Sequence, residues 1–329
     1  MSLLEKATRS PKKSSSQSRS SLFTKALASL EPARAEPPGP LASIDYDGLQ
    51  REIGTLPQGP DSMLALWSLV TERLPLSALA LFLPRGDFLE LAAQNGFPEA
   101  PQAGLSSRCV DLGIPPSLAL SSRSPGSALG AEAVAIVSPI LGLASTIDVR
   151  GASMNSFGGL HGLWVYHDPL LAAMSETECG RLGSFLARAP EGLPALSLAP
   201  ATPDPSKALL AASRKYLSAS VLAFDFSSMT EAPALKGLRP LALASAVFAT
   251  SSRILSQAGA AFCDSCGRFS CVLGSASTAD PELALFQFSK TLKRALPSLA
   301  AFGLPAGRAL FLDPAAENCL EEIRAFLQP

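Results

Sequence analysis

A proline-rich break near the middle of the chain is the strongest constraint on how this sequence can fold. It holds Pro190, Pro194, Pro200, Pro203 and Pro205. Proline fixes φ and removes a backbone donor, so this density favours an extended spacer over a helix or a central strand. A chain of 329 residues has room for two domains. We therefore predict a linker at 191–205, with one domain at 43–190 and a second at 206–329.

The first 42 residues have a different composition from the rest. Serine is dense at positions 14–21, and the first thirty residues hold six basic side chains against the single acid Glu5, although the whole chain has a net charge of −1. Such a segment has little to bury and is predicted to be disordered. Weak contact with anionic lipid or nucleic acid stays open. Because the charge is on a tail and not on a folded face, we expect no sequence-specific nucleic-acid binding.

Hydropathy and cysteine content indicate a cytoplasmic protein. Hydrophobic residues make up 47% of the chain and charged residues 17%, which is typical of a globular protein. Six cysteines are too sparse for a disulfide framework, and no secretory signal is evident. The longest apolar, uncharged stretch, 133–147, contains Pro139 and is shorter than the about 20 residues of a membrane span. We expect no transmembrane segment.

The predicted first domain alternates helices and strands. Asp61 is placed to cap a helix that reaches Arg73, because apolar residues recur at steps of three and four. Ser175 and Glu178 form a capping box that opens a second helix. Strands are predicted at 78–83, 88–93, 134–141 and 160–166, and a loop at 144–159.

The predicted second domain follows a similar pattern. Helices are expected at 207–217 and 241–257, and after the helix-start signals Asp280-Pro281 and Asp313-Pro314. Strands are expected at 220–224, at 309–312 and as a hairpin over 260–273. The fold class is therefore α/β (α+β), with two domains that each have a central, mainly antiparallel sheet flanked by helices.

The first domain resembles the GAF family of small-molecule sensory domains over residues 58–190. The resemblance rests on element order and on the segments 79–83, 88–98, 137–141 and 161–166. It implies a ligand cavity on one face of the sheet, or a role in dimerisation. The Asn-Lys…Phe…Asp-Glu pattern of the cyclic-nucleotide binders and a Cys-His pair for bilin attachment are missing, so the resemblance implies no particular ligand.

The second domain resembles a degenerate GGDEF domain, the diguanylate cyclase fold, over residues 206–329. In active members the first strand ends in an Asp-x-Asp metal motif, and here Asp225-Phe-Ser227 retains only the first acid. The signature turn corresponds to Ser265-Cys-Gly-Arg-Phe269, in which both acids are missing and Arg268 stands instead. Joining two nucleoside triphosphates needs carboxylate-bound metal ions, which a single Asp cannot hold. The resemblance therefore implies a module without cyclase activity.

These patterns favour a bacterial-type signalling protein that acts by binding and is not an enzyme, with no cofactor or metal. We expect a sensory or dimerising first domain and a second domain that binds a protein partner or a nucleotide. Candidate ligand-binding residues are His161 and Trp164 in the first domain and Asp225 and Arg268 in the second. A residual nucleotide-processing enzyme that uses Asp225, and a purely structural adaptor, remain as alternatives.

Two further features bear on partners and redox chemistry. The helices at 63–74 and 175–189 are candidates for a homodimer contact. Cys263, Cys266 and Cys271 lie close together in the predicted hairpin. Zinc would need a fourth ligand, and a redox pair favours a strand-to-helix setting. Small buried hydrophobic side chains are the simpler interpretation, and a thiol switch remains open.

Overall fold

The computed structural model of the chain describes most of the sequence from Ile44 onward. It covers residues 44–85, 88–98, 149–156, 159–194, 197–227, 235–255, 259–264, 266–275 and 280–328, with separate residues between 126 and 142 and Met229. The predicted tail at 1–42 lies outside the described residues. Residues 39–329 form one compact unit. Among the helices of the described part, none has the length and apolar character to cross a membrane.

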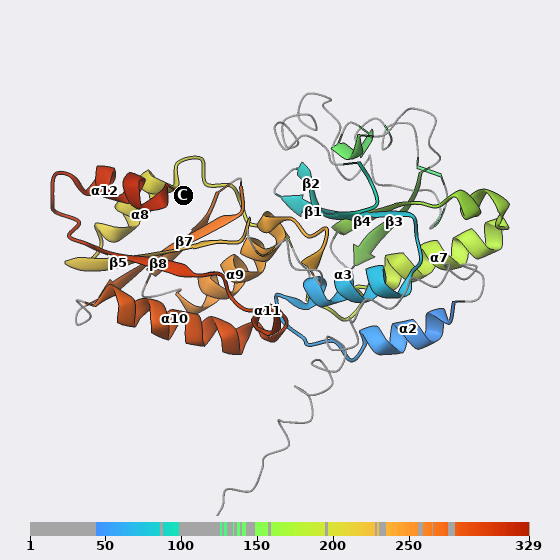
Figure 1. Cartoon of the computed structure of the whole chain (residues 1–329), viewed down its shortest axis with the longest axis horizontal. Coiled ribbons are helices and arrows are strands. Elements are labelled where there is room, and N and C mark those ends of the chain that lie inside the picture. The colour runs from blue at the N-terminus through green and yellow to red at the C-terminus, as the bar shows by residue number, and fades with distance from the viewer. Residues whose placement is uncertain are drawn as a thin grey trace, which may run out of the picture. The chain divides into compact units, whose positions relative to one another are not determined.

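The first half of the chain, residues 44–190, is built on a four-stranded antiparallel sheet with the order β2-β1-β4-β3. Its strands are β1 (Ala78–Arg85), β2 (Phe88–Asn95), β3 (Arg150–Ser156) and β4 (Gly159–His167). Its helices are α2 (Tyr46–Ile53), α3 (Ser62–Arg73), the short η2 (Pro169–Ala173) and α7 (Glu176–Arg188). Figure 1 shows α2, α3 and α7 together on one side of this sheet.

Apolar side chains of the first sheet are buried on both of its faces. On β4, Leu163 and Val165 join one core cluster with Phe82, whereas Trp164 and Tyr166 join the cluster formed with α3 and α7. Successive strand residues point to opposite faces, so a run of apolar residues fills both. This explains why β1 and β4 read as continuous hydrophobic stretches in the sequence.

The second half, residues 206–328, is built on another four-stranded antiparallel sheet, with the order β6-β7-β5-β8. Its strands are β5 (Ser218–Asp225), β6 (Gly259–Cys263), β7 (Arg268–Ser275) and β8 (Gly307–Leu312). Its helices are α8 (Pro205–Ser213), α9 (Pro240–Ile254), α10 (Pro281–Ala295), α11 (Pro297–Phe302) and α12 (Cys319–Leu327). The α/β class, with two antiparallel sheets flanked by helices, is confirmed.

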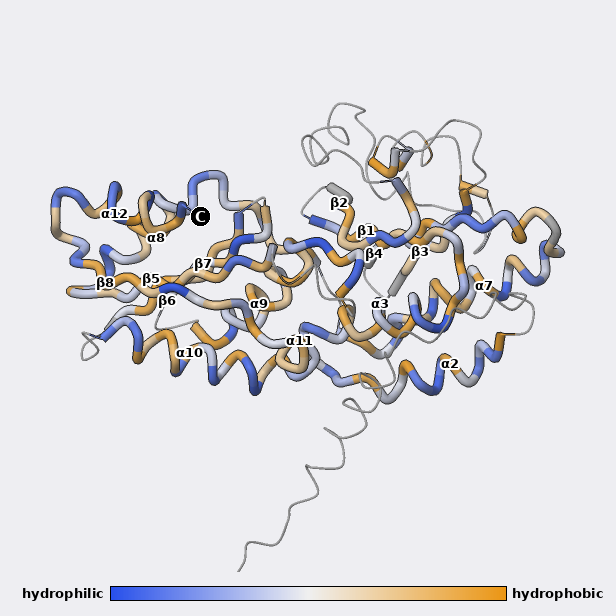
Figure 2. The backbone as a smooth tube through the Cα atoms, in the orientation of Figure 1, coloured by the Kyte–Doolittle hydropathy of each residue, from blue (hydrophilic) through white to orange (hydrophobic). Residues whose placement is uncertain are grey.

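The second sheet is a layer between two pairs of helices. Val221 of β5 packs in the cluster of α8 and α12, while Leu222 and Phe224 face the cluster of α9 and α10. Figure 1 shows the pair α8 and α12 on one side of the sheet and α9 and α10 on the other. In Figure 2, α10 changes between hydrophilic and hydrophobic colour from turn to turn, as a helix with one buried face does.

Several helix starts are as the sequence predicts. The Ser175 hydroxyl accepts from the Glu178 amide, and the Glu178 carboxylate accepts from the Ser175 amide, which completes the capping box. Asp280 accepts from the amides of Glu282 and Leu283 at the start of α10. The predicted hairpin over 260–273 is also present, as β6 and β7.

Three predicted elements are corrected by the structure. The described residues of 134–141 are helical, with Val137, Ile140 and Leu141 buried at helical spacing. A short run that is apolar throughout cannot distinguish a buried strand from a helix, which explains the error. The predicted loop at 144–159 contains β3, which pairs with β4 despite a Ser- and Gly-rich sequence.

The third correction concerns the last helix, which does not begin at Asp313-Pro314. The Asp313 carboxylate accepts from the Ala315 amide and closes an isolated turn, and α12 begins only at Cys319. Asp followed by Pro is equally compatible with a turn and with a helix start, because both need a carboxylate acceptor for a nearby amide.

The proline-rich segment packs against both halves of the chain. The Leu198 amide donates to the Pro84 carbonyl of β1, and the Thr202 amide donates to the Cys263 carbonyl of β6. Leu198 and Ala199 are buried. One hydrophobic cluster accordingly contains α3, residues 198–199 and α9 together.

Candidate functional site

Asp225 and Arg268 lie opposite one another at the ends of two paired strands. Asp225 is the last residue of β5 and Arg268 is the first of β7, and the two are cross-strand partners. Arg268 Nε is 3.7 Å from Asp225 Oδ2, with the arginine side chain 42% and the aspartate side chain 44% exposed. Asp225 Oδ1 also accepts a hydrogen bond from the Ser227 amide at 2.9 Å. The structure thus brings together the two candidate residues of the second half.

The surroundings of Asp225 stabilise the charged form of its carboxyl. Partial burial works to raise the pKa of its carboxyl, but the hydrogen bond from Ser227 and the charges of Arg268 and Arg308 outweigh burial and lower that pKa. Arg308 lies on β8, the strand on the other side of β5. Two guanidinium groups therefore share this end of the sheet with the carboxylates of Asp225 and Asp264. The guanidinium groups are donors suited to a phosphate or a carboxylate.

The turn before Arg268 is closed by its own aspartate. Asp264 Oδ1 accepts from the amides of Cys266 and Arg268, both at 2.8 Å, and the Asp264 amide donates to the Arg268 carbonyl. Gly267 has φ of +85° and lies against the backbone at the start of α9. Local hydrogen bonds and a glycine that needs a positive φ therefore fix where the Arg268 side chain begins.

Among the residues that the structure describes, carboxylates for a two-metal site are not gathered at this turn. Where a second acid would follow Asp225, Ser227 supplies a backbone donor to it instead. The described residues contain no group of three His, Cys, Asp or Glu side chains that could hold a metal ion. The residues at the end of β5 fit anion binding and do not fit the metal-bridged transfer of a nucleotidyl group.

Trp164 and His161 lie in the first sheet, apart from the pair in the second. Trp164 is 0% exposed and stacks on Trp67 of α3, with ring centroids 6.1 Å apart. His161 belongs to β4 at a bulge, where the pairing moves from Met154–Gly162 to Asn155–Leu160. The His161 side chain is outside the described part. Trp164 faces α3 and α7, so it lies on the opposite face of the sheet from Leu163 and Val165.

The three cysteines near the turn differ in exposure. Cys263 and Cys271 are buried, and Cys266 is exposed. Burial raises the pKa of the Cys263 thiol to about 12 and also raises the pKa of the Cys271 thiol. Neither buried group forms a thiolate readily near neutral pH, and the thiolate is the reactive form. Their environment matches small buried hydrophobic side chains.

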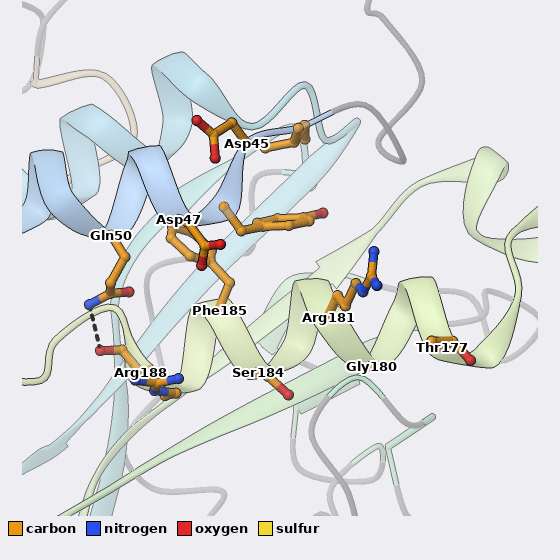
Figure 3. Close-up of a pocket in the computed structure, with 11 residues that line it drawn as sticks. Asp45, Asp47, Gln50, Thr177, Gly180, Arg181, Ser184, Phe185 and Arg188 are labelled. Carbon is orange, nitrogen blue, oxygen red and sulfur yellow. Dashed lines mark hydrogen bonds between the residues drawn. The ribbon is translucent and has the colours of Figure 1, made fainter.

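A cleft between α2 and α7 is a feature that the sequence did not indicate. It has a volume of about 700 Å³, and Tyr46 and Phe185 pack together within it, with ring centroids 5.4 Å apart. Figure 3 shows acidic side chains at α2 and basic ones on α7. The short helix α2 was not predicted from the sequence, and the cleft was therefore not predicted either. Its lining residues are Ile44, Asp45, Tyr46, Asp47, Gln50, Thr177, Gly180, Arg181, Ser184, Phe185 and Arg188.

Comparison with known proteins adds little to this geometry. No family model and no curated protein matches the sequence. Among solved structures, the chain is similar to a part of PelD from Pseudomonas aeruginosa PA14 in complex with c-di-GMP, at 16% identity and a TM-score of 0.24, covering 87% of this chain and 95% of that one. PelD from strain PAO1 gives 16% identity and a TM-score of 0.24, covering 86% and 95%. Scores of this size do not define a shared fold.

Proposed function

We propose that this chain is a non-catalytic signalling protein whose second half binds a phosphate-bearing ligand at Arg268. In this proposal the first half is a GAF-like sensory or dimerising domain, and the second is a GGDEF-like domain that has lost its catalytic acids. The observation that supports it best is the Asp225–Arg268 pair: an arginine occupies the turn where the resemblance implies carboxylates. A guanidinium binds phosphate oxygens directly, whereas the catalysed reaction needs metal ions there.

The geometry favours a nucleotide or another phosphate ester over a protein carboxylate as the first ligand to test. Arg268 and Arg308 lie on the two strands that flank β5. Arg308 Nη2 donates to the Gln328 carbonyl at 2.9 Å and its guanidinium lies over the Phe326 ring, so a second phosphate group of a ligand would use its remaining donors. Asp225 would then orient Arg268 and limit binding to ligands that overcome its own negative charge. This selectivity is typical of a site with mixed charge.

Thermal unfolding with a panel of nucleotides tests the proposal. GTP, c-di-GMP, cyclic AMP and cyclic GMP are each added with and without Mg²⁺. A ligand present at about 100 times its Kd stabilises the protein by about 2.7 kcal/mol. We expect at least one nucleotide to raise the unfolding temperature without Mg²⁺. Arg268→Ala should abolish this increase. Arg294→Ala, which changes an exposed arginine of α10, is the matched control.

The same samples distinguish the other functions. Turnover of GTP that Asp225→Ala abolishes would identify a residual enzyme and overturn the proposal. A panel without any shift would favour the adaptor. A shift that survives Arg268→Ala and is lost in a variant of His161 would place the ligand in the first half.

The proposal includes a homodimer, with the cleft between α2 and α7 as its contact. Of the two helices suggested by the sequence, α3 buries Met63, Leu66 and Trp67 and has little surface to offer. The helix α7 is more exposed and presents Arg181 and Arg188 beside Asp45 and Asp47 of α2. In a twofold contact, the acids of one copy can face the bases of the other. A cytoplasmic location remains a prediction.

A further inference from the structure

A buried arginine of the first sheet reaches the turn that carries Arg268. Arg85 ends β1 and is 7% exposed. Its Nη1 is 2.7 Å from Glu90 Oε2 on β2, and the Glu90 side chain is only 13% exposed. Taking a charged pair out of water is costly unless the remaining donors are satisfied. The partners of the other guanidinium nitrogens therefore show what this buried charge holds in place.

Those partners lie outside the first sheet. Arg85 Nε donates to the Ala199 carbonyl at 2.8 Å, within the proline-rich segment. Arg85 Nη2 donates to the Asp264 carbonyl at 3.3 Å, in the turn between β6 and β7. One planar group thus joins β1, the connecting segment and this turn. Only arginine offers donors in a fixed fork that can serve three acceptors at once.

Asp264 links this arginine to the proposed ligand site. The Asp264 carbonyl accepts from Arg85, while its carboxylate accepts from the Arg268 amide, and Arg268 in turn pairs with Asp225. A continuous series of contacts therefore runs from Glu90 through Arg85, Asp264 and Arg268 to Asp225. It begins in the first sheet and ends at the site in the second.

We infer that Arg85 is a positioning residue, which holds the turn at 264–268 so that Arg268 can bind its ligand. The inference rests on the proposed function, and it adds that ligand affinity depends on the β1–β2 hairpin of the first half. A buried ion pair is weak evidence for stability, because apolar side chains of similar volume often do as well. What apolar side chains cannot supply is the pair of directed bonds to Ala199 and Asp264.

The test uses the full chain and compares Arg85→Met and Arg85→Lys with one control variant, Arg73→Met. Arg73→Met breaks the ion pair between Arg73 and Glu52, which is 3.0 Å long, lies in the same half and is about half exposed. The first readout needs no ligand: hydrogen exchange of residues 264–268, together with the alkylation rate of the exposed Cys266 thiol, assigned by mass spectrometry. The second readout is binding of GTP and c-di-GMP by calorimetry.

We expect both Arg85 variants to speed exchange and Cys266 alkylation at the turn, while β1 and β5 stay protected and Arg73→Met changes neither rate. Lys keeps the charge but cannot reach three acceptors, so it should behave like Met. Affinity for whichever nucleotide binds the wild type should fall about 2- to 30-fold, the range of coupling between linked sites.

Unchanged exchange at residues 264–268 in Arg85→Met would overturn the inference. An equal rise in the exchange rates of β1 and β5 would also overturn it, because that result indicates general destabilisation. If Arg85→Met does not fold, Arg85→Lys provides the same comparison because it also removes the guanidinium, and an unchanged exchange rate of residues 264–268 in that variant would also overturn the inference. If neither nucleotide binds the wild type, the proposed function fails, and the exchange data still decide whether Arg85 holds the turn.

Discussion

Asp61 Oδ2 accepts a hydrogen bond of 2.7 Å from the backbone amide of Ser298, a residue far away in the sequence. The Leu299 amide donates to the same oxygen at 3.1 Å. Asp61 precedes α3 but makes no side-chain cap to it, and it is 0% exposed. This carboxylate therefore satisfies the free amides at the start of α11 in the second half, where those groups would otherwise be buried without a partner.

Replacing Asp61 should lower the free energy of unfolding. Asp61→Ala leaves two buried amides unpaired, which costs about 1–3 kcal/mol for each unsatisfied group. Asp61→Asn keeps an acceptor oxygen and should cost less. Chemical denaturation measures both, and Asp47→Ala, at an exposed acid of α2, is the control. Equal losses for the Ala and Asn variants would show that the hydrogen bonds are not the source of the effect.

The pH dependence of stability should carry a component from Asp61. Burial raises the pKa of its carboxyl, and the hydrogen bonds from Leu299 and Ser298 only partly oppose this. The folded state then binds a proton more readily than the unfolded state, whose pKa is about 3.9. The wild type should thus lose stability relative to Asp61→Asn as pH rises from about 4 through the raised folded value. If the difference in unfolding free energy between the wild type and Asp61→Asn is constant with pH, Asp61 is not the source of the pH dependence.

Gly267→Ala should destabilise the turn beside the ligand site. An added Cβ would be strained at φ of +85° and would also overlap the backbone of Pro240 and Leu241. Gly303 has the same φ with no neighbour within 4 Å, so Gly303→Ala isolates the conformational cost. We expect about 1–3 kcal/mol for Gly303→Ala and a larger loss for Gly267→Ala in thermal unfolding. Equal losses would mean that the α9 backbone gives way.

The sequence was sufficient for elements whose signal is local. The capping box at Ser175 and the cap at Asp280 need only nearby amides, and both formed as predicted. Asp61 is a case that local signals could not predict. Its position before α3 is that of a helix cap, yet its carboxylate accepts from the amides of Ser298 and Leu299 instead. The strand β3 was missed for a related reason, because its pairing with β4 overrides the low strand propensity of its Ser and Gly residues.

The residues of the candidate site also differ in whether the sequence could predict their place. Asp225 and Arg268 could be assigned to one site because the resemblance to the GGDEF fold implies it, although the pairing of their strands, β5 and β7, was not predicted. Arg308 and Arg85 could not, since their relation to the turn depends on strand order and on contacts between the halves. No pattern in the sequence around Arg85 distinguishes it from an ordinary arginine at the end of a strand.

Charge reversal across the cleft between α2 and α7 should test the proposed dimer. In a twofold contact Asp47 of one copy would face Arg181 of the other, so Arg181→Glu places like charges together and should weaken association at least about threefold. Asp47→Lys should act in the same way, and the double variant should restore the dimer because opposite charges face again. Sedimentation equilibrium measures all three, with Arg294→Glu on α10 as the control.

Restoration in the double variant carries the most weight in this experiment. Either single substitution could weaken association by disturbing its own helix, and two such disturbances would add. Only a direct contact between the two positions predicts that the second substitution reverses the first. A chain that stays monomeric at high concentration, or a double variant weaker than both single variants, would rule out this contact and leave α2 and α7 free for another partner.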